Sequence, residues 1–310
     1  MTRQFRLPGS CAAIITVLTQ TGCIAPLATF FEVLPVRVAN RGLDIQAEFG
    51  RPFATCGGRV LRMDVFHAAQ AVGPAPAVVL VHGGFWLYGE RWYMHDWSAD
   101  LAAHGYTAVS IDYRLIGQGG RYPEPVMDVL AAIAYLREYA DELNVDPERI
   151  ALFGVSAGAH LALLAGLAGD ASIFDSTWPA GESTNVKAVV EIYGPTDFTV
   201  DPASVTLWQS RLVSLFLGYD QAGAPDLYRE ASAITYVRAD GPPVFILHGT
   251  RDPIVPVTQA RALRDALEGA GQPHEYYEMK DAGHFWGSMW ANRFAQRHRD
   301  DILRFLHEHL

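Results

Sequence analysis

Ser156 lies at the centre of the pentapeptide Gly-Val-Ser-Ala-Gly, residues 154–158. The apolar run 150–153 before it is typical of a strand, and the pattern over 161–167 after it is typical of a helix. A serine on such a sharp turn lifts its hydroxyl above the sheet edge, and small residues two positions before and after make room for the turn. The helix N-terminus would stabilise an oxyanion at the same place. The pattern therefore predicts that Ser156 is a nucleophile.

A serine hydroxyl is a weak nucleophile until a base removes its proton. His284, at the end of Asp-Ala-Gly-His after the last predicted strand, is the expected base. Asp252, in His-Gly-Thr-Arg-Asp after the preceding strand, is the acid expected to orient it. Asp197, which follows an earlier strand, and Asp281, which is close in sequence to the base, are rival acids. His160 is expected to flank the site rather than to act as the base.

The loop at residues 82–86, His-Gly-Gly-Phe-Trp, follows another predicted strand. Glycines there allow the backbone to approach a substrate carbonyl and to turn its N–H groups toward it. We expect the peptide N–H groups of Gly84, Phe85 and Ala157 to form an oxyanion hole, with Gly83 needed for the turn.

Elsewhere the chain alternates between apolar runs and segments with helical spacing. Strands are expected at 60–66 (an antiparallel edge strand), 77–81, 107–111, 150–153, 186–192, 244–247 and 274–279, and helices at 126–143, 161–167, 257–270 and 302–310. Continuous apolar runs are typical of parallel strands that are buried on both faces. The alternation therefore predicts an α/β protein with a parallel sheet and helices on both faces.

The stretch 194–234 is long for a connection and contains two segments with helical spacing, at 204–217 and 226–231. Long insertions in compact domains often form lids or binding elements, so we expect a small lid here. Ordinary surface helices are the alternative.

Several motifs together resemble one known family. They are residues 82–86, Ser-Ile-Asp-Tyr-Arg-Leu at 110–115, Gly-Val-Ser-Ala-Gly-Ala-His at 154–160 and His-Gly-Thr-Arg-Asp at 248–252. They resemble the carboxylesterase branch of the α/β-hydrolase superfamily, near its hormone-sensitive-lipase-like and bacterial feruloyl or acetyl-xylan esterase-like members. The resemblance implies the α/β-hydrolase fold, with a mostly parallel eight-stranded sheet, and a pairing of Arg114 with Asp128. It also implies a serine carboxylic ester hydrolase that needs no cofactor and acts on short-chain acyl or aryl esters through an acyl-enzyme.

Two departures from this pattern leave the substrate class open. Phe85 stands where lipase-like members often carry a third glycine, and Ala159 replaces a common second glycine. Both departures also occur in kynurenine-formamidase-like enzymes, so an arylformamidase acting on a C–N bond is the alternative. A third alternative is a binding protein that has the hydrolase fold without catalysis.

Aromatic residues near these loops indicate an apolar pocket for a small-molecule ester. Phe85 and Trp86 flank the oxyanion loop, Phe285 and Trp286 follow the expected base, and Trp208 lies in the expected lid. We expect these residues to contact short acyl or aryl groups.

Charge and cysteine content exclude other classes of function. The formal net charge is −10 and no basic run offsets it, which argues against a nucleic-acid partner. The three cysteines, Cys11, Cys23 and Cys56, have neither the spacing of a metal site nor the density of a disulfide framework. We therefore expect no metal.

The first residues indicate export. Arg3 and Arg6 precede an apolar run at 11–18 that is too short to span a bilayer but suits a signal peptide. Residues 20–23 resemble a lipoprotein cleavage box. We expect a signal peptide at 1–22, lipidation and membrane attachment through Cys23 in the bacterial envelope or periplasm, an N-terminal segment at 23–55, and the catalytic domain at 56–310. An apolar helix that stays packed on the domain is the alternative.

Overall fold

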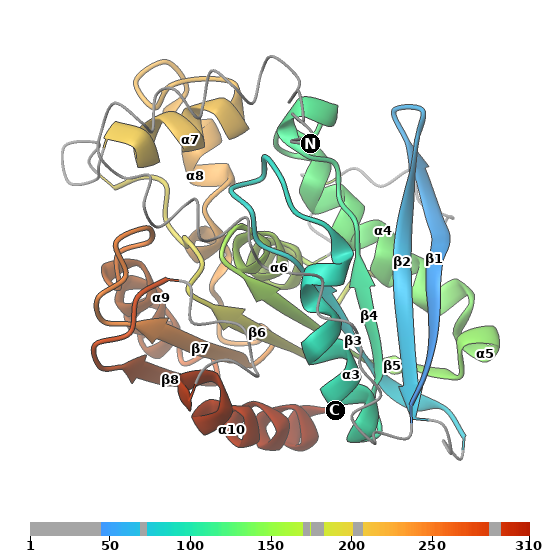
Figure 1. Ribbon diagram of the computed structural model, residues 1–310. Helices are drawn as coiled ribbons and strands as arrows, with labels where there is room; N and C mark the ends of the chain where they lie inside the picture. The colour runs from blue at the N-terminus through green and yellow to red at the C-terminus, as the bar shows by residue number, and fades with distance from the viewer. Residues whose placement is uncertain (1–44, 69–72, 170–173, 175–182, 201–206, 285–292) are drawn as a thin grey trace, which may run out of the picture. The chain divides into compact units, whose positions relative to one another are not determined.

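A computed structural model describes residues 45–68, 73–169, 174, 183–200, 207–284 and 293–310, all within one compact unit, residues 40–310. In this part of the chain, eight strands form one sheet (Figure 1): β1 (Ile45–Cys56), β2 (Arg59–Ala68), β3 (Ala75–Val81), β4 (Thr107–Ile111), β5 (Val145–Val155), β6 (Ala188–Ile192), β7 (Val244–Gly249) and β8 (His274–Met279). Their order is β1-β2-β4-β3-β5-β6-β7-β8, and only the β1–β2 and β2–β4 pairs are antiparallel. The expected eight-stranded, mostly parallel sheet is confirmed.

Helices cover both faces of this sheet. The described helices and 3₁₀ turns are η1 (Arg91–Met94), α3 (His95–Ala103), η2 (Ile116–Gln118), α4 (Glu124–Glu138), α5 (Ala140–Leu143), α6 (Ala157–Ala168), α7 (Leu207–Leu217), α8 (Pro225–Glu230), η4 (Ala233–Tyr236), α9 (Thr258–Ala270) and α10 (Arg293–His309). One core lies between the sheet and α4, α6 and α9, and a second lies between the sheet and α3 and α10 (Figure 1).

The two cores follow from the alternation of side chains along each strand. On β5, Leu152 belongs to the core under α4, α6 and α9, and Phe153 belongs to the opposite core, where its ring lies 4.8 Å from that of Trp97. Both side chains are fully buried. Burial on both faces explains why the central strands are continuous apolar runs in the sequence.

The edge of the sheet differs from the prediction. Residues 60–66 lie within β2, which pairs with a strand on each side, and the edge strand is β1. β1 has bulges between Glu48 and Arg51 and between Pro52 and Ala54, and most of its residues are exposed or half-buried. The bulges interrupt the two-residue period by which a strand is recognised. The sheet thus includes Ile45–Cys56, a segment that the sequence assigned to a stretch before the catalytic domain.

The helix predicted at 126–143 is divided. α4 ends at Glu138, Tyr139 leaves the helical conformation with φ −107° and ψ 26°, and α5 follows. Asn144 ends α5 in the left-handed conformation with φ 51°, as its residue type favours at a helix C-terminus. In the stretch predicted as a lid, the structure contains α7, α8 and η4. Among the described helices, none combines the length and the apolar character needed to cross a bilayer.

Candidate active site

Ser156 occupies the turn between β5 and α6 in a strained conformation. Its φ of 54° and ψ of −122° lie where residues other than glycine are rarely found. Its N–H donates to the carbonyl of Ile192 at 2.9 Å, which fastens the turn to the end of β6. The neighbouring strand thus helps to hold the serine in this conformation.

The flanking glycines are required because backbone segments meet there. A Cβ on Gly154 would lie 2.3 Å from the Gly158 carbonyl oxygen. A Cβ on Gly158 would lie 2.2 Å from the carbonyl oxygen of Val81, at the end of β3. Any larger residue at either position would separate the serine turn from its surroundings. The steric requirement inferred from the sequence pattern is therefore present.

Ser156, His284 and Asp252 form one hydrogen-bonded chain at the carboxyl ends of β5, β7 and β8. Ser156 Oγ lies 2.9 Å from His284 Nε2, and His284 Nδ1 lies 2.6 Å from Asp252 Oδ2. Asp252 Oδ1 accepts from the N–H groups of Ile254 and Val255 at 2.8 and 2.9 Å. Because the carboxylate can only accept, His284 donates from Nδ1 and leaves Nε2 as the acceptor for the serine hydroxyl.

The electrostatics of this chain suit a neutral imidazole beside an ionised carboxylate. Burial lowers the pKa of His284 below its ordinary value, against the opposing effect of Asp252. Burial by itself raises the pKa of Asp252, but hydrogen bonds from His248 and His284 outweigh it and bring that pKa to about 2. At neutral pH the chain therefore has a base that is able to take a proton and an acid that is able to stabilise the resulting imidazolium.

The rival residues have other partners. Asp197 Oδ1 accepts from the backbone N–H of Thr199 at 2.7 Å, and Asp281 pairs with Arg251 at 2.9 Å. His160 is buried in α6, where its Nε2 donates to the Ala231 carbonyl at 2.8 Å. Asp252 thus occupies the Nδ1 side of His284, as the prediction required.

The oxyanion loop lies against the serine turn. A Cβ on Gly83 would be 3.1 Å from Ser156 Cβ, and Gly84 has φ +131°, a conformation open to glycine. The Gly84 carbonyl accepts from the N–H groups of Leu87 and Tyr88 at 3.0 and 3.1 Å, which forms a compact turn after β3. Phe85 and Ala157, from the two sides of the predicted oxyanion hole, line the same cavity as Ser156. The structure thus brings together the segments that carry the predicted donors.

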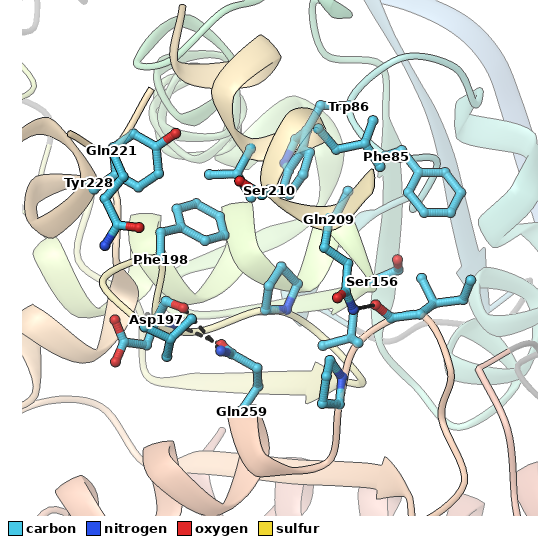
Figure 2. Close-up of a pocket in the computed structure, with 18 residues that line it drawn as sticks. Phe85, Trp86, Ser156, Asp197, Phe198, Gln209, Ser210, Gln221, Tyr228 and Gln259 are labelled. Carbon is cyan, nitrogen blue, oxygen red and sulfur yellow. Dashed lines mark hydrogen bonds between the residues drawn. The ribbon is translucent and has the colours of Figure 1, made fainter. Parts of the chain in front are cut away.

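A cavity of about 720 Å³, part of it open to solvent, adjoins Ser156. Its walls come from the oxyanion loop, the segment after β6, the helices α7 and α8, and the loop between β7 and α9. Figure 2 shows Phe85 and Trp86 on the same side as Ser156, and Asp197, Gln221 and Tyr228 on the far side. Polar side chains at the margin of the cavity form hydrogen bonds with the backbone. For example, Gln221 Nε2 donates to the Thr199 carbonyl at 3.0 Å. Apolar side chains supply most of the remaining surface: Phe85, Trp86, Phe198, Val200, Leu212, Val213, Ile254 and Val255.

Two of the aromatic residues predicted to bind substrate line this cavity. Phe85 is one, and Trp86 is the other, stacked on Phe216 with ring centroids 4.5 Å apart. Trp208 is in α7, but its side chain is outside the described part of the structure. Phe285, Trp286 and Cys23 also lie outside the described residues.

Other cavity residues could not be foreseen from local patterns. Leu212, Val213 and Tyr228 come from the two helices that follow β6, and their spacing indicates only an amphipathic helix. Arg114 and Asp128 do form the ion pair implied by the resemblance, at 2.8 Å, with Asp128 fully buried.

Comparisons with known proteins agree with this architecture. Esterase LipC of Mycobacterium tuberculosis is 36% identical over 217 residues, which cover 68% of this chain and 53% of LipC. Esterase LipQ of the same organism is 33% identical, over 74% of this chain and 55% of LipQ. The chain thus spans about half the length of these curated relatives.

Solved structures show the same fold. The thermophilic esterase Est2 from Thermogutta terrifontis superposes with a TM-score of 0.72 at 25% identity, over 84% of this chain and 92% of Est2. A truncated carbohydrate esterase from gut microbiota gives 0.76 at 23% identity, over 85% of this chain and 96% of that one. The BD-FAE family profile matches residues 63–267, more than half of the chain. With its eight-stranded α/β-hydrolase sheet and this match, the chain belongs to the BD-FAE family.

Proposed function

We propose that this protein is a carboxylic ester hydrolase that cleaves short-chain acyl or aryl esters through an acyl-enzyme on Ser156. The hydrogen-bonded chain from Ser156 through His284 to Asp252, beside an apolar cavity, is the observation that carries the proposal. The curated relatives described as esterases support the same chemistry.

The proposed reaction transfers the acyl group first to Ser156 and then to water. Ser156 Oγ attacks the ester carbonyl carbon while His284 Nε2 takes the hydroxyl proton, and Asp252 stabilises the imidazolium. The N–H groups of Gly84, Phe85 and Ala157 hold the developing oxyanion. The bond to the alcohol then breaks, and the alcohol leaves with the proton from His284. Water then attacks the acyl carbon while His284 takes one of its protons. The bond from the acyl carbon to Ser156 Oγ breaks, His284 returns the proton to Oγ, and the acid leaves.

The cavity argues for a small substrate. The space beside Ser156 is lined mainly by apolar side chains, as in many small-molecule sites. Side chains of α7, among them Leu212 and Val213, form one wall. We expect this wall to favour acetate and butyrate esters over longer acyl chains, because α7 closes one side of the cavity.

Hydrolysis of nitrophenyl acetate, butyrate and octanoate by the wild type and by Ser156→Ala tests the proposal. We expect the short esters to be preferred and the variant to lose several orders of magnitude in kcat. Ester hydrolysis that survives in Ser156→Ala would overturn the role of the serine. A wild type that cleaves N-formylkynurenine faster than any of the esters would place it with the arylformamidases instead.

We further propose that residues 1–22 are an export signal and that Cys23 is lipidated, which would attach the protein to a membrane of the bacterial envelope. Arg3, Arg6 and the apolar run 11–18 support this proposal. In a bacterial host, the protein should lack residues 1–22 and carry the mass of acyl chains, and Cys23→Ser should remove that mass. A membrane fraction that contains only the intact, unmodified N-terminus would contradict it.

A further inference from the structure

A second imidazole lies beside Asp252. His248, on β7, is fully buried, and its Nε2 donates to the Val255 carbonyl at 2.8 Å. The same nitrogen lies 3.4 Å from Asp252 Oδ2, the oxygen that also accepts from His284 Nδ1 at 2.6 Å. Because a carbonyl only accepts, the proton of neutral His248 is on Nε2, where it also faces the carboxylate. One oxygen of Asp252 thus faces two imidazoles.

Glu191, on the neighbouring strand β6, is a buried carboxyl that the proposed reaction does not use. It pairs in register with Ile246, two residues before His248, so Glu191 and His248 face the same side of the sheet. One oxygen, Oε1, accepts from the Gly194 N–H. Within the part of the chain that the structure describes, neither the other oxygen, Oε2, nor His248 Nδ1 has a hydrogen-bond partner. Burying two such atoms costs free energy unless their charges interact favourably.

The other titratable groups near His248 do not replace this interaction. Glu278 of β8 is next to His248 in register, but it is bound by Arg261 of α9 at 2.7 Å. His160 of α6 is neutral at ordinary pH because burial lowers its pKa to about 4. Burial raises the pKa of Tyr193, which follows β6, so this phenol is also neutral. Among the described residues, Asp252 and ionised Glu191 are therefore the charged groups that act on His248. Burial raises the pKa of Glu191 to about 7, so Asp252 supplies the negative charge beside His248 at lower pH.

We propose that His248 is a positioning residue for Asp252, and that Glu191 acts through His248 by favouring its protonated form. The proposal rests on the proposed function, because it assigns His248 and Glu191 to the acid of that triad. The Nε2–H of His248 draws negative charge away from Asp252 Oδ2. When His248 is protonated, its positive charge also opposes the addition of a second proton to His284. His284 therefore remains neutral at lower pH than it would beside Asp252 alone, and in this form it is able to accept the serine proton.

The shifts in pKa have the same direction as this geometry. After burial, which raises it, the largest influence on the pKa of Asp252 is the hydrogen bond from His248, which lowers it. The charge of His248 also lowers the pKa of His284. Although burial lowers the pKa of His248, Asp252 and Glu191 together raise it above its ordinary value.

His248→Gln tests the role of the second imidazole. The variant keeps a side-chain donor for the Val255 carbonyl but cannot be protonated. We expect the acidic limb of the kcat/KM profile, and the NMR titration midpoint of His284, to rise by about one pH unit. Activity at pH values below the limb should fall about tenfold, while KM and the alkaline plateau change little. A uniform loss at every pH, with an unmoved limb, would indicate a merely structural role and overturn the proposal.

His95→Gln is the matched control. His95 Nε2 lies 2.7 Å from Asp64 Oδ2, so it too is a buried imidazole beside a buried aspartate, on elements that carry no residue of the triad. This variant should have a comparable cost in stability and leave the acidic limb where it is. An equal shift of the limb in His95→Gln would mean that the effect is not specific to His248.

Glu191→Gln tests the second part and keeps the test available if His248→Gln does not fold. Its amide preserves the size of the side chain and the acceptor for the Gly194 N–H, so the NMR titration midpoint of His248 should fall. An unchanged midpoint would remove Glu191 from the proposal. The NMR titrations do not depend on turnover, so they decide this inference even if Ser156→Ala shows that the proposed ester hydrolysis is wrong.

Discussion

Asp252→Asn changes a single atom of the proposed triad, and the structure allows its effect to be worked out. Oδ1 accepts two backbone N–H groups, from Ile254 and Val255, and Oδ2 accepts from His284. An amide has only one oxygen, and the two backbone donors will take it. The amide NH₂ then faces His284 Nδ1, which must give up its proton. The stable tautomer would carry its proton on Nε2 and donate to Ser156, so it could not accept the serine proton.

In the active tautomer of His284, the Nδ1–H group would face the amide NH₂ of the variant side chain at position 252. Two N–H donors would then oppose each other in a buried site. Each unpaired buried donor costs about 1–3 kcal/mol, and the lost charge-assisted bond to the imidazolium costs about 1.5–3 kcal/mol. Together these terms amount to about 5 kcal/mol, or roughly four orders of magnitude in kcat/KM. A loss of about 10⁴ in kcat is also what the same change causes in the Ser-His-Asp template.

The assay is hydrolysis of nitrophenyl acetate at pH 8 by the wild type, Asp252→Asn and Asp281→Asn, with ¹⁵N NMR to identify the tautomer of His284. Asp281 is a fitting control because it is half exposed, pairs with Arg251, and has φ 62°, which asparagine tolerates well. Asp281→Asn should retain activity within a few-fold. If Asp252→Asn kept kcat/KM within tenfold of the wild type, or its His284 kept the proton on Nδ1, the reasoning would be refuted.

Three further predictions concern the loop, the buried carboxyl and the cavity. In Gly84→Ala the new methyl group would lie 1.8 Å from the Tyr88 carbonyl oxygen, so the oxyanion loop must shift and kcat should fall about 10²-fold or more; a kcat within threefold of the wild type, measured against titrated active sites, would contradict this. Burial raises the pKa of Glu191 to about 7, from about 4.5 in the unfolded chain. Protonated Glu191 therefore stabilises the fold fully below pH 4.5, and this stabilisation, about 3 kcal/mol, is lost as the pH rises through 7. The Tm of Glu191→Gln should therefore depend less on pH between 5 and 8 than the Tm of the wild type. If calorimetry finds the same pH dependence of Tm in both proteins, the raised pKa of Glu191 is contradicted. Val213→Ala enlarges the cavity beside α7, and should raise the octanoate-to-butyrate ratio of kcat/KM by at least about threefold; an unchanged ratio would mean that the acyl chain lies elsewhere.

The residues of the site could be predicted because local constraints determine them. The Ser156 turn needs glycines wherever backbone segments meet, and the spacing of Gly154 and Gly158 is visible in the sequence. The central strands were recognised because burial on both faces leaves a continuous apolar run. The acid and the base followed from their places just after the last two strands, where side chains from parallel neighbours meet at one edge of the sheet.

Features that depend on distant contacts could not be predicted in this way. β1 pairs through bulges and is largely exposed, so its sequence lacks the alternation of a regular strand. The cavity walls on α7 and α8 depend on how these helices pack, which periodicity does not determine. His248 and Glu191 are ordinary strand residues in the sequence, and only the register between β6 and β7 places them on one face beside Asp252.

The strand order also determines when in its synthesis this protein could become active. Chains emerge from the ribosome N-terminus first, so the serine turn between β5 and α6 is present well before Asp252 and His284. Both of these follow strands that dock in sequence order at one edge of the sheet, β7 beside β6 and then β8 beside β7. A nascent chain that ends before β8 would carry the proposed nucleophile without its base. Hydrolytic activity would therefore appear late, and its recovery during refolding would report the closing of the last parallel strand pair rather than the formation of the nucleophile turn.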